Sequence, residues 1–147
     1  MSAQEWLAVL RIGVGLWWLE SWRHKDKAAW FERGAGIAWA ASVAEKHRWA
    51  LVRRAFAATV AARPKLMSYL VVFGELAIGL GLVAGFLTPV AAAAGLLLNV
   101  SYFVLMIHDW AEQGQNSMMA LIEVAILGGT AGDVWSLDAA LGWFGAG

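Results

Sequence analysis

The sequence predicts an all-α membrane protein: a four-transmembrane-helix bundle with an interfacial amphipathic helical segment between helices 1 and 2. The 147 residues are 61% hydrophobic and 15% charged, with a mean hydropathy of +0.60, whereas soluble domains are nearer half apolar and a quarter charged. The apolar residues gather in four stretches long enough to cross a bilayer. Most basic residues lie in one segment between two of these stretches. We expect a single membrane domain over residues 1–147.

A membrane-spanning helix needs about 20 apolar residues, with a lower limit of about 17. The second and third stretches are the strongest candidates, because one has Glu75 as its only charge and the other has none. The four predicted spans are residues 6–22, 66–87, 89–107 and 117–135.

The second and third spans are predicted to form an antiparallel hairpin, because almost no residues separate them. Gly85 is expected to end the first helix, since glycine is favoured after a helix C-terminus. Thr88 is expected to cap the next helix, and Pro89 fits its first turn, where no backbone donor is lost.

Residues 23–65 hold ten of the eleven Lys and Arg residues. Apolar residues recur here at helical spacing between the basic ones, which predicts an amphipathic helix at the membrane interface. The basic side chains could bind anionic lipid, dock an acidic partner or form a solvated face. The positive-inside rule puts this segment on the cytoplasmic side. The apolar residues are Trp49, Val52, Phe56 and Val60.

Several classes of chemistry are not expected of this chain. It has no cysteine, so it offers no thiolate ligand for a metal or an iron-sulfur cluster. None of its three histidines is paired along a helix, so we expect no metal and no haem. A net charge of zero argues against a nucleic acid partner. The chain should therefore need an electron carrier from elsewhere for any redox role.

Four polar residues fall within roughly 5 Å of the bilayer centre when each span is centred there at 1.5 Å per residue. They are Arg11, Glu75, Asn99 and Glu123, one from each span. A charge at that depth costs at least about 2.5 kcal/mol, so such side chains usually face the bundle interior and find partners. We expect a buried cluster in which Arg11 pairs with Glu75 or Glu123.

One carboxyl group of this cluster would remain without a cation, because two glutamates share one guanidinium. A buried glutamate of that kind is a candidate for proton exchange with a ligand. The alternative is that the cluster only fixes the order of the helices. Trp17 and Trp18 have a similar ambiguity, since they could line a pocket for a flat ligand or fill the core.

Several short motifs resemble those of the DoxX/DoxD-like membrane proteins, and their order and spacing agree over most of the chain. The resemblance implies a four-helix membrane bundle and quinone-linked redox work in a membrane complex, as in the small subunit of thiosulfate:quinone oxidoreductase. It points to Arg11, Glu75 and Asn99. The motifs are Leu10-Arg11-Ile12-Gly13-Val14-Gly15-Leu16, Gly74-Glu75-Leu76, Gly85-Phe86-Leu87-Thr88, Asn99, Asn116 and Ser136-Leu137-Asp138.

These observations together predict a quinone-binding membrane subunit of an oxidoreductase complex, with no redox cofactor of its own. Glu75 or Glu123 would exchange a proton as the catalytic group. The partners of the protein would be the lipid bilayer and other subunits of the complex, in a prokaryotic inner membrane. The residues expected to bind the quinone are Arg11 and Asn99, as hydrogen-bond donors, and Trp17, Trp18, Tyr102 and Phe103, as walls of the headgroup pocket.

The main alternative is an accessory subunit that contacts lipids, pigments or partner helices of a respiratory or photosynthetic complex without catalysis. The many tryptophans of the chain suit that role equally. A small-solute transporter is a weaker alternative, because four short spans leave little room for alternating access and no pair of broken helices is evident.

Overall fold

The computed structural model describes residues 1–129 and 131–143, and over these residues the protein is helical without a β-strand. The predicted all-α class is confirmed. The elements, in chain order, are α1 (Ala3–His24), α2 (Lys27–Arg33), α3 (Ala35–Glu45), α4 (Ala50–Phe56), the π-helical segment η1 (Ala57–Ala61), α5 (Pro64–Ala84), α6 (Thr88–Leu105), α7 (Trp110–Gly128) and α8 (Leu137–Ala140).

Two helices, α5 and α6, are long and apolar enough to cross a membrane. They correspond to the predicted spans 66–87 and 89–107. Helices α1 and α7 have similar lengths, 22 and 19 residues, but within the described chain they do not reach the same apolar character. The structure thus indicates membrane association through α5 and α6, and the four-span bundle stays a prediction.

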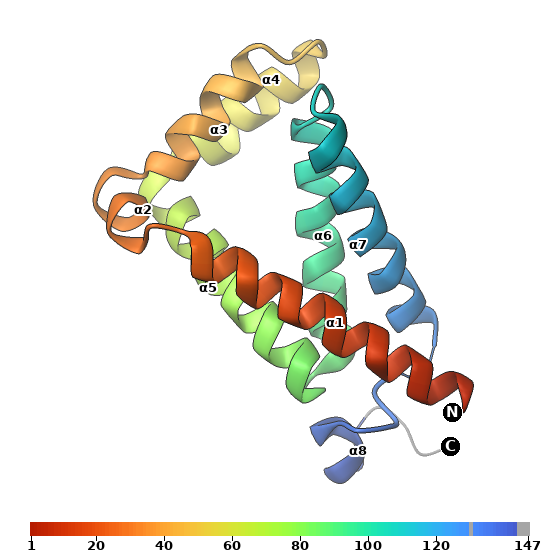
Figure 1. Cartoon of the computed structure of the whole chain (residues 1–147). Coiled ribbons are helices and arrows are strands. Elements are labelled where there is room, and N and C mark those ends of the chain that lie inside the picture. The colour runs from red at the N-terminus through yellow and green to blue at the C-terminus, as the bar shows by residue number, and fades with distance from the viewer. Residues whose placement is uncertain (130, 144–147) are drawn as a thin grey trace.

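The four long helices pack as two neighbouring pairs, α1 along α5 and α6 along α7 (Figure 1). Two glycines let α1 and α5 approach closely in antiparallel directions. A Cβ atom at Gly15 would lie 2.8 Å from the backbone nitrogen of Val83, and one at Gly79 would lie 3.0 Å from that of Leu19. The core between the pairs includes Val14, Trp18, Ile78, Leu82, Ala92, Met119 and Ile126.

The predicted bounds of the fourth helix were wrong. Helix α7 begins at Trp110 and ends at Gly128, so it starts seven residues before the predicted span 117–135 and stops before Trp135. Asp109 caps its start, because the side chain accepts hydrogen bonds from the amides of Ala111 and Glu112. The prediction was based on hydropathy and therefore left out the polar first turns of this helix. The capping residue Asp109 marks its true start.

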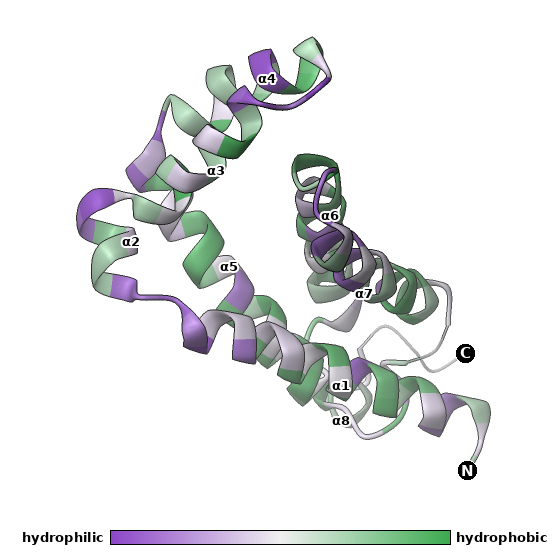
Figure 2. Ribbon diagram, turned by 45° about the horizontal axis from the view of Figure 1, so that its top comes forward, coloured by the Kyte–Doolittle hydropathy of each residue, from purple (hydrophilic) through white to green (hydrophobic). Residues whose placement is uncertain are grey.

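Residues 27–61, which we call the arm, leave the bundle between α1 and α5 (Figure 1). Hydrophilic residues gather in its α2 and α4 (Figure 2). The predicted amphipathic helix is present as α4 and η1, which lie against α3. Its apolar residues Val52, Phe56 and Val60 are half-buried. The placement of this segment at a membrane surface stays a prediction.

His47 anchors the turn between α3 and α4 to the end of α6. The residue is buried, and its Nε2 lies 3.0 Å from the carbonyl oxygen of Val104. The backbone N–H of Trp49 donates to Nδ1 at 3.1 Å. Because Nδ1 accepts, Nε2 must be the protonated nitrogen, and the ring is the neutral tautomer.

The C-terminal helix α8 lies beside the turn between α5 and α6 (Figure 1). Gly85 ends α5 with φ +63°, as the sequence predicts. Thr88 does not cap α6, contrary to prediction, because Leu87 holds the cap position without a side-chain bond. Instead the buried carboxylate of Asp138 accepts from the amides of Leu87 and Thr88 at 2.8 and 2.7 Å.

We predict that Asp138→Asn destabilises the protein by about 1–3 kcal/mol, because an amide group cannot accept both hydrogen bonds and one buried donor loses its partner. Thermal unfolding of the purified protein in lipid nanodiscs, followed by circular dichroism, measures the loss. Asp133→Asn is the matched control, since no hydrogen bond or ion pair of that side chain is found among the described residues. Equal midpoints for the two variants would contradict the assigned role of Asp138.

Candidate functional site

A cavity of about 770 Å³ lies between the four long helices and the arm. The second half of α1, the first half of α5 and the facing turns of α6 and α7 form its walls, and the arm covers it. Most of the lining is apolar. The large aromatic residues of the lining are Trp17, Trp18, Trp30, Trp39, Phe56 and Tyr102.

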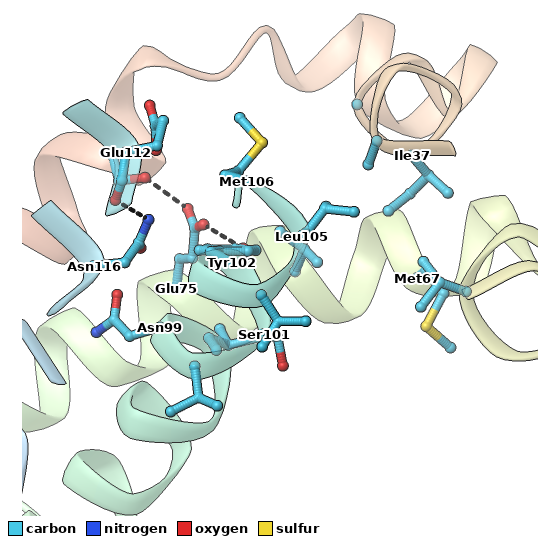
Figure 3. A pocket seen from close by; sticks show the side chains of 18 of the residues that line it. Ile37, Met67, Glu75, Asn99, Ser101, Tyr102, Leu105, Met106, Glu112 and Asn116 are labelled. Carbon is cyan, nitrogen blue, oxygen red and sulfur yellow. Dashed lines mark hydrogen bonds between the residues drawn. The ribbon is translucent and has the colours of Figure 1, made fainter. Parts of the chain in front are cut away.

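Glu75 of α5 lies at the polar end of this cavity (Figure 3). The residue is fully buried, and its carboxylate is ion-paired with Lys25, whose Nζ lies 2.5 Å from Oε2. The hydroxyl of Tyr102 donates to Oε1 at 3.0 Å, and that of Ser21 donates to Oε2 at 3.3 Å. The carboxylate therefore has a cation and two hydroxyl donors.

Glu123 of α7 forms a second buried group, which does not line the cavity itself but is bonded to two residues that do. The indole Nε1 of Trp18 donates to Oε1 at 2.9 Å, and Nδ2 of Asn99 donates to Oε2 at 2.8 Å. All three residues are at most 2% exposed. No ion pair of Glu123 is found among the described residues, so this carboxyl group has neutral donors alone.

The groups around Glu75 and Glu123 take donors from the same two helices. Helices α5 and α7 each supply a carboxylate, and α1 and α6 supply the donors to both. Trp18, Ser21 and Lys25 follow one another at spacings of three and four, which puts them on one face of α1 as it ends. Asn99 and Tyr102 are three residues apart on α6. Each buried carboxylate therefore connects three helices.

The predicted pairing of Arg11 with a glutamate was wrong. Its guanidinium is fully buried, but Nη1 donates to the carbonyl of Leu82 at 2.7 Å and Nη2 to that of Trp135 at 2.7 Å. A longer bond of 3.4 Å reaches the carbonyl of Val134. The carboxylate of Asp138 supplies the nearby negative charge. Arg11 does not line the cavity.

The physical reason is the offset between α1 and α5. Because Gly15 packs beside Val83, Arg11 lies at the level of the last turn of α5. The final carbonyls of a helix lack partners within it, and a planar guanidinium can donate to two at once. Counting residues from the middle of each span assigned Arg11 to the membrane centre because that count ignores such offsets.

The remaining predicted residues divide into two sets. Glu75, Asn99, Trp17, Trp18 and Tyr102 line the cavity, as predicted for a binding site, although their functional roles stay predictions. Glu123 and Phe103 do not line the cavity. Glu123 is buried and bonded to Trp18 and Asn99, whereas Phe103 is 38% exposed, on another face of α6 than Tyr102.

Sequence reasoning missed three residues of the site. Lys25 was counted with the basic segment, yet it lies one residue after α1 ends and reaches Glu75. Ser21 lies within the predicted span 6–22 but is not among the predicted site residues. Asn116 of α7 lines the cavity and is 2% exposed. The spacing of Ser21 and Lys25 behind Trp18 was the signal that could have found the first two. Among the described residues, no group of three His, Asp or Glu side chains is placed to hold a metal.

We predict that Trp18→Phe destabilises the protein by about 1 kcal/mol, since one oxygen of buried Glu123 loses its donor. Trp17→Phe is the matched control, because that neighbouring side chain is 49% exposed and makes no hydrogen bond to a described residue. Thermal midpoints in nanodiscs compare the two. A control that loses as much stability as Trp18→Phe would refute the role given to the indole.

We also predict strong coupling between Lys25 and Glu75. Lys25→Met leaves a buried carboxylate without its cation and should cost about 3–5 kcal/mol, whereas the double variant Lys25→Met/Glu75→Gln should lose less than that single variant. A double-mutant cycle of unfolding free energies measures the difference. Additive losses would show that the two groups do not act as a pair.

Comparisons of the chain with protein-family models, with curated proteins and with solved structures found no match. What the protein does has therefore to be inferred from the cavity, its two carboxyl groups and the donors that surround them.

Proposed function

We propose that this protein is a quinone-binding membrane subunit of an oxidoreductase complex. In this proposal α1, α5, α6 and α7 all cross the bilayer, with the basic arm on the cytoplasmic side. The observation that carries the proposal is the cavity, whose largely apolar walls end at buried Glu75 and its partners Lys25 and Tyr102. Membership of the DoxX/DoxD-like family is part of the same proposal.

The residues of the cavity fit a quinone in size and character. Small-molecule sites usually have volumes of about 300–1,000 Å³ and apolar walls with few polar groups, and this cavity has about 770 Å³. Aromatic side chains such as Trp17 and Trp18 suit a flat ring and an isoprenoid tail. A bound quinone would supply the two-electron chemistry that the chain's own side chains lack.

Glu75 would hold and transfer the proton that accompanies quinone chemistry. Its carboxylate faces the cavity, while Lys25 keeps a positive charge beside it. The side chain of Lys25 is 15% exposed, so the pair connects the buried carboxylate with the outside. Tyr102 and Ser21 orient the carboxylate through their hydroxyl groups. Glu123, which has no cation, is the second candidate for proton exchange.

Arg11 has a different role in this proposal from the one expected from the sequence. Its Nη1 and Nη2 groups donate to backbone carbonyls, and the residue does not line the cavity. It would stabilise the end of the bundle and leave ligand binding to residues of α5, α6 and the second half of α1. Electron transfer would require a partner subunit, because no side chain of this chain carries electrons as a cofactor does.

The proposal is tested by measuring quinone binding to the protein and to a variant whose cavity is filled by a larger side chain. We predict that decylubiquinone or its reduced form binds saturably to the protein in phosphatidylcholine nanodiscs, measured by quenching of tryptophan fluorescence against empty nanodiscs. Val71 lines the cavity, and Val71→Trp should weaken binding at least about tenfold, or 1.4 kcal/mol. The matched control is Val90→Trp, an exposed position of α6 outside the cavity.

Two outcomes would contradict the proposal. One is the absence of saturable binding by either form of the carrier. The other is equal binding by the two tryptophan variants, which would place the carrier in the surrounding lipid. Either result favours the accessory subunit, in which the buried carboxylates only fix the packing of the helices.

A further inference from the structure

We propose that the cavity prefers the reduced carrier, a hydroquinone, because two side-chain amide oxygens that border it lack a hydrogen-bond donor from the described part of the chain, which a ligand hydroxyl would supply. This inference rests on the proposed quinone-binding function. It follows from the hydrogen bonds that the cavity residues already make.

The donors around Glu75 and Glu123 are already used by these two carboxylates. Lys25, Ser21 and Tyr102 each donate to the carboxylate of Glu75. The N–H groups of Trp18 and Asn99 that reach Glu123 are used in the same way. A quinone carbonyl, which only accepts hydrogen bonds, would compete with a buried carboxylate for these donors.

By contrast, two side-chain amide oxygens that border the cavity have no hydrogen-bond donor among the described residues. Asn99 is fully buried and lines the cavity, and its Oδ1 has no hydrogen-bond partner. Its amide orientation follows from chemistry, because Nδ2 faces the acceptor oxygen of Glu123 at 2.8 Å. The carbonyl end must therefore point away from Glu123. Figure 3 shows it directed toward the side on which Asn116 lies.

Asn116 repeats the pattern on the facing helix α7. Its Nδ2 donates to the backbone carbonyl of Glu112 at 2.7 Å, which again fixes which end of the amide is the oxygen. No described residue donates to this Oδ1. Two carboxamide oxygens, from α6 and α7, thus border one cavity without a donor from the protein.

A ligand hydroxyl satisfies such an oxygen, whereas a ligand carbonyl brings two acceptors together and leaves both unpaired. Sites built to bond a hydroxyl reject analogues that lack it, because the buried polar group of the protein is then without a partner. A hydroquinone has two hydroxyl groups, and its oxidised form has none. The reduced form should therefore bind more tightly.

The test compares the two oxidation states of one probe, decylubiquinol and decylubiquinone, on the full chain in phosphatidylcholine nanodiscs. We expect decylubiquinol to bind at least about tenfold more tightly. The midpoint potential of the bound carrier should then rise by about 30 mV, because a tenfold difference corresponds to that value for two electrons. Tryptophan quenching gives the affinities, and a redox titration gives the potential.

Two variants remove the acceptors. Asn99→Leu and Asn116→Leu should each reduce the preference for the reduced form to less than about threefold. Asn116→Leu keeps the test decisive if Asn99→Leu does not fold, since Asn116 donates only within its own helix. Ser117→Ala is the matched control, because its hydroxyl bonds Gln113 of the same helix and lies outside the cavity. It should keep the tenfold preference.

The outcomes separate the two proposals. If neither form binds, the proposed function itself fails. If both forms bind equally or the quinone binds more tightly, that function stands and the preference is refuted. Retention of the preference in Asn116→Leu would also refute it. Binding of farnesol without binding of decylubiquinol would overturn the hydroquinone assignment in favour of a lipid alcohol.

Discussion

The burial of two carboxyl groups is the constraint on which the bundle depends. An ionised or unpaired carboxyl group inside a protein is costly unless hydrogen-bond donors surround it. Here Glu75 and Glu123 lie on α5 and α7, and each takes its donors from both α1 and α6. Both carboxyl groups reach their donors at the same time only when the four helices have this arrangement and this offset along their axes. The same arrangement leaves a cavity bordered by the polar groups that satisfy it.

Charge is balanced in two separate places. Lys25 neutralises Glu75 at the cavity, and Asp138 faces Arg11 at the other end of α1. Arg11 and Asp138 together bind the carbonyls and amides of the turn between α5 and α6 and of the chain leading to α8. The end of the bundle is thus held by backbone contacts. The cavity keeps its own cation and needs none from the far end.

Much of the helical core could be predicted from the sequence. Apolar length predicted the ends of α5 and α6 to within three residues. Centring the predicted spans put Asn99 at the level of Glu123, to which it is hydrogen-bonded. The partner of Arg11 could not be predicted, because it depends on how far α1 slides along α5, which close glycine packing determines. Lys25 was missed because composition assigned it to the basic interfacial segment 23–65. The start of α7 was missed because a hydropathy profile does not detect a polar helical turn, even one that is capped by a side chain such as Asp109.

Lys25 lies at the junction between α1 and the arm, and its ammonium group also faces the ring of Trp30 in α2 at 5.4 Å. The side chain of Lys25 therefore contacts both the arm, which covers the cavity, and the carboxylate of Glu75, which lines it. When Glu75 takes up a proton, the ion pair loses its Coulomb attraction and this connection weakens. In the proposed function, the arm would therefore be held less tightly over the cavity when Glu75 is protonated.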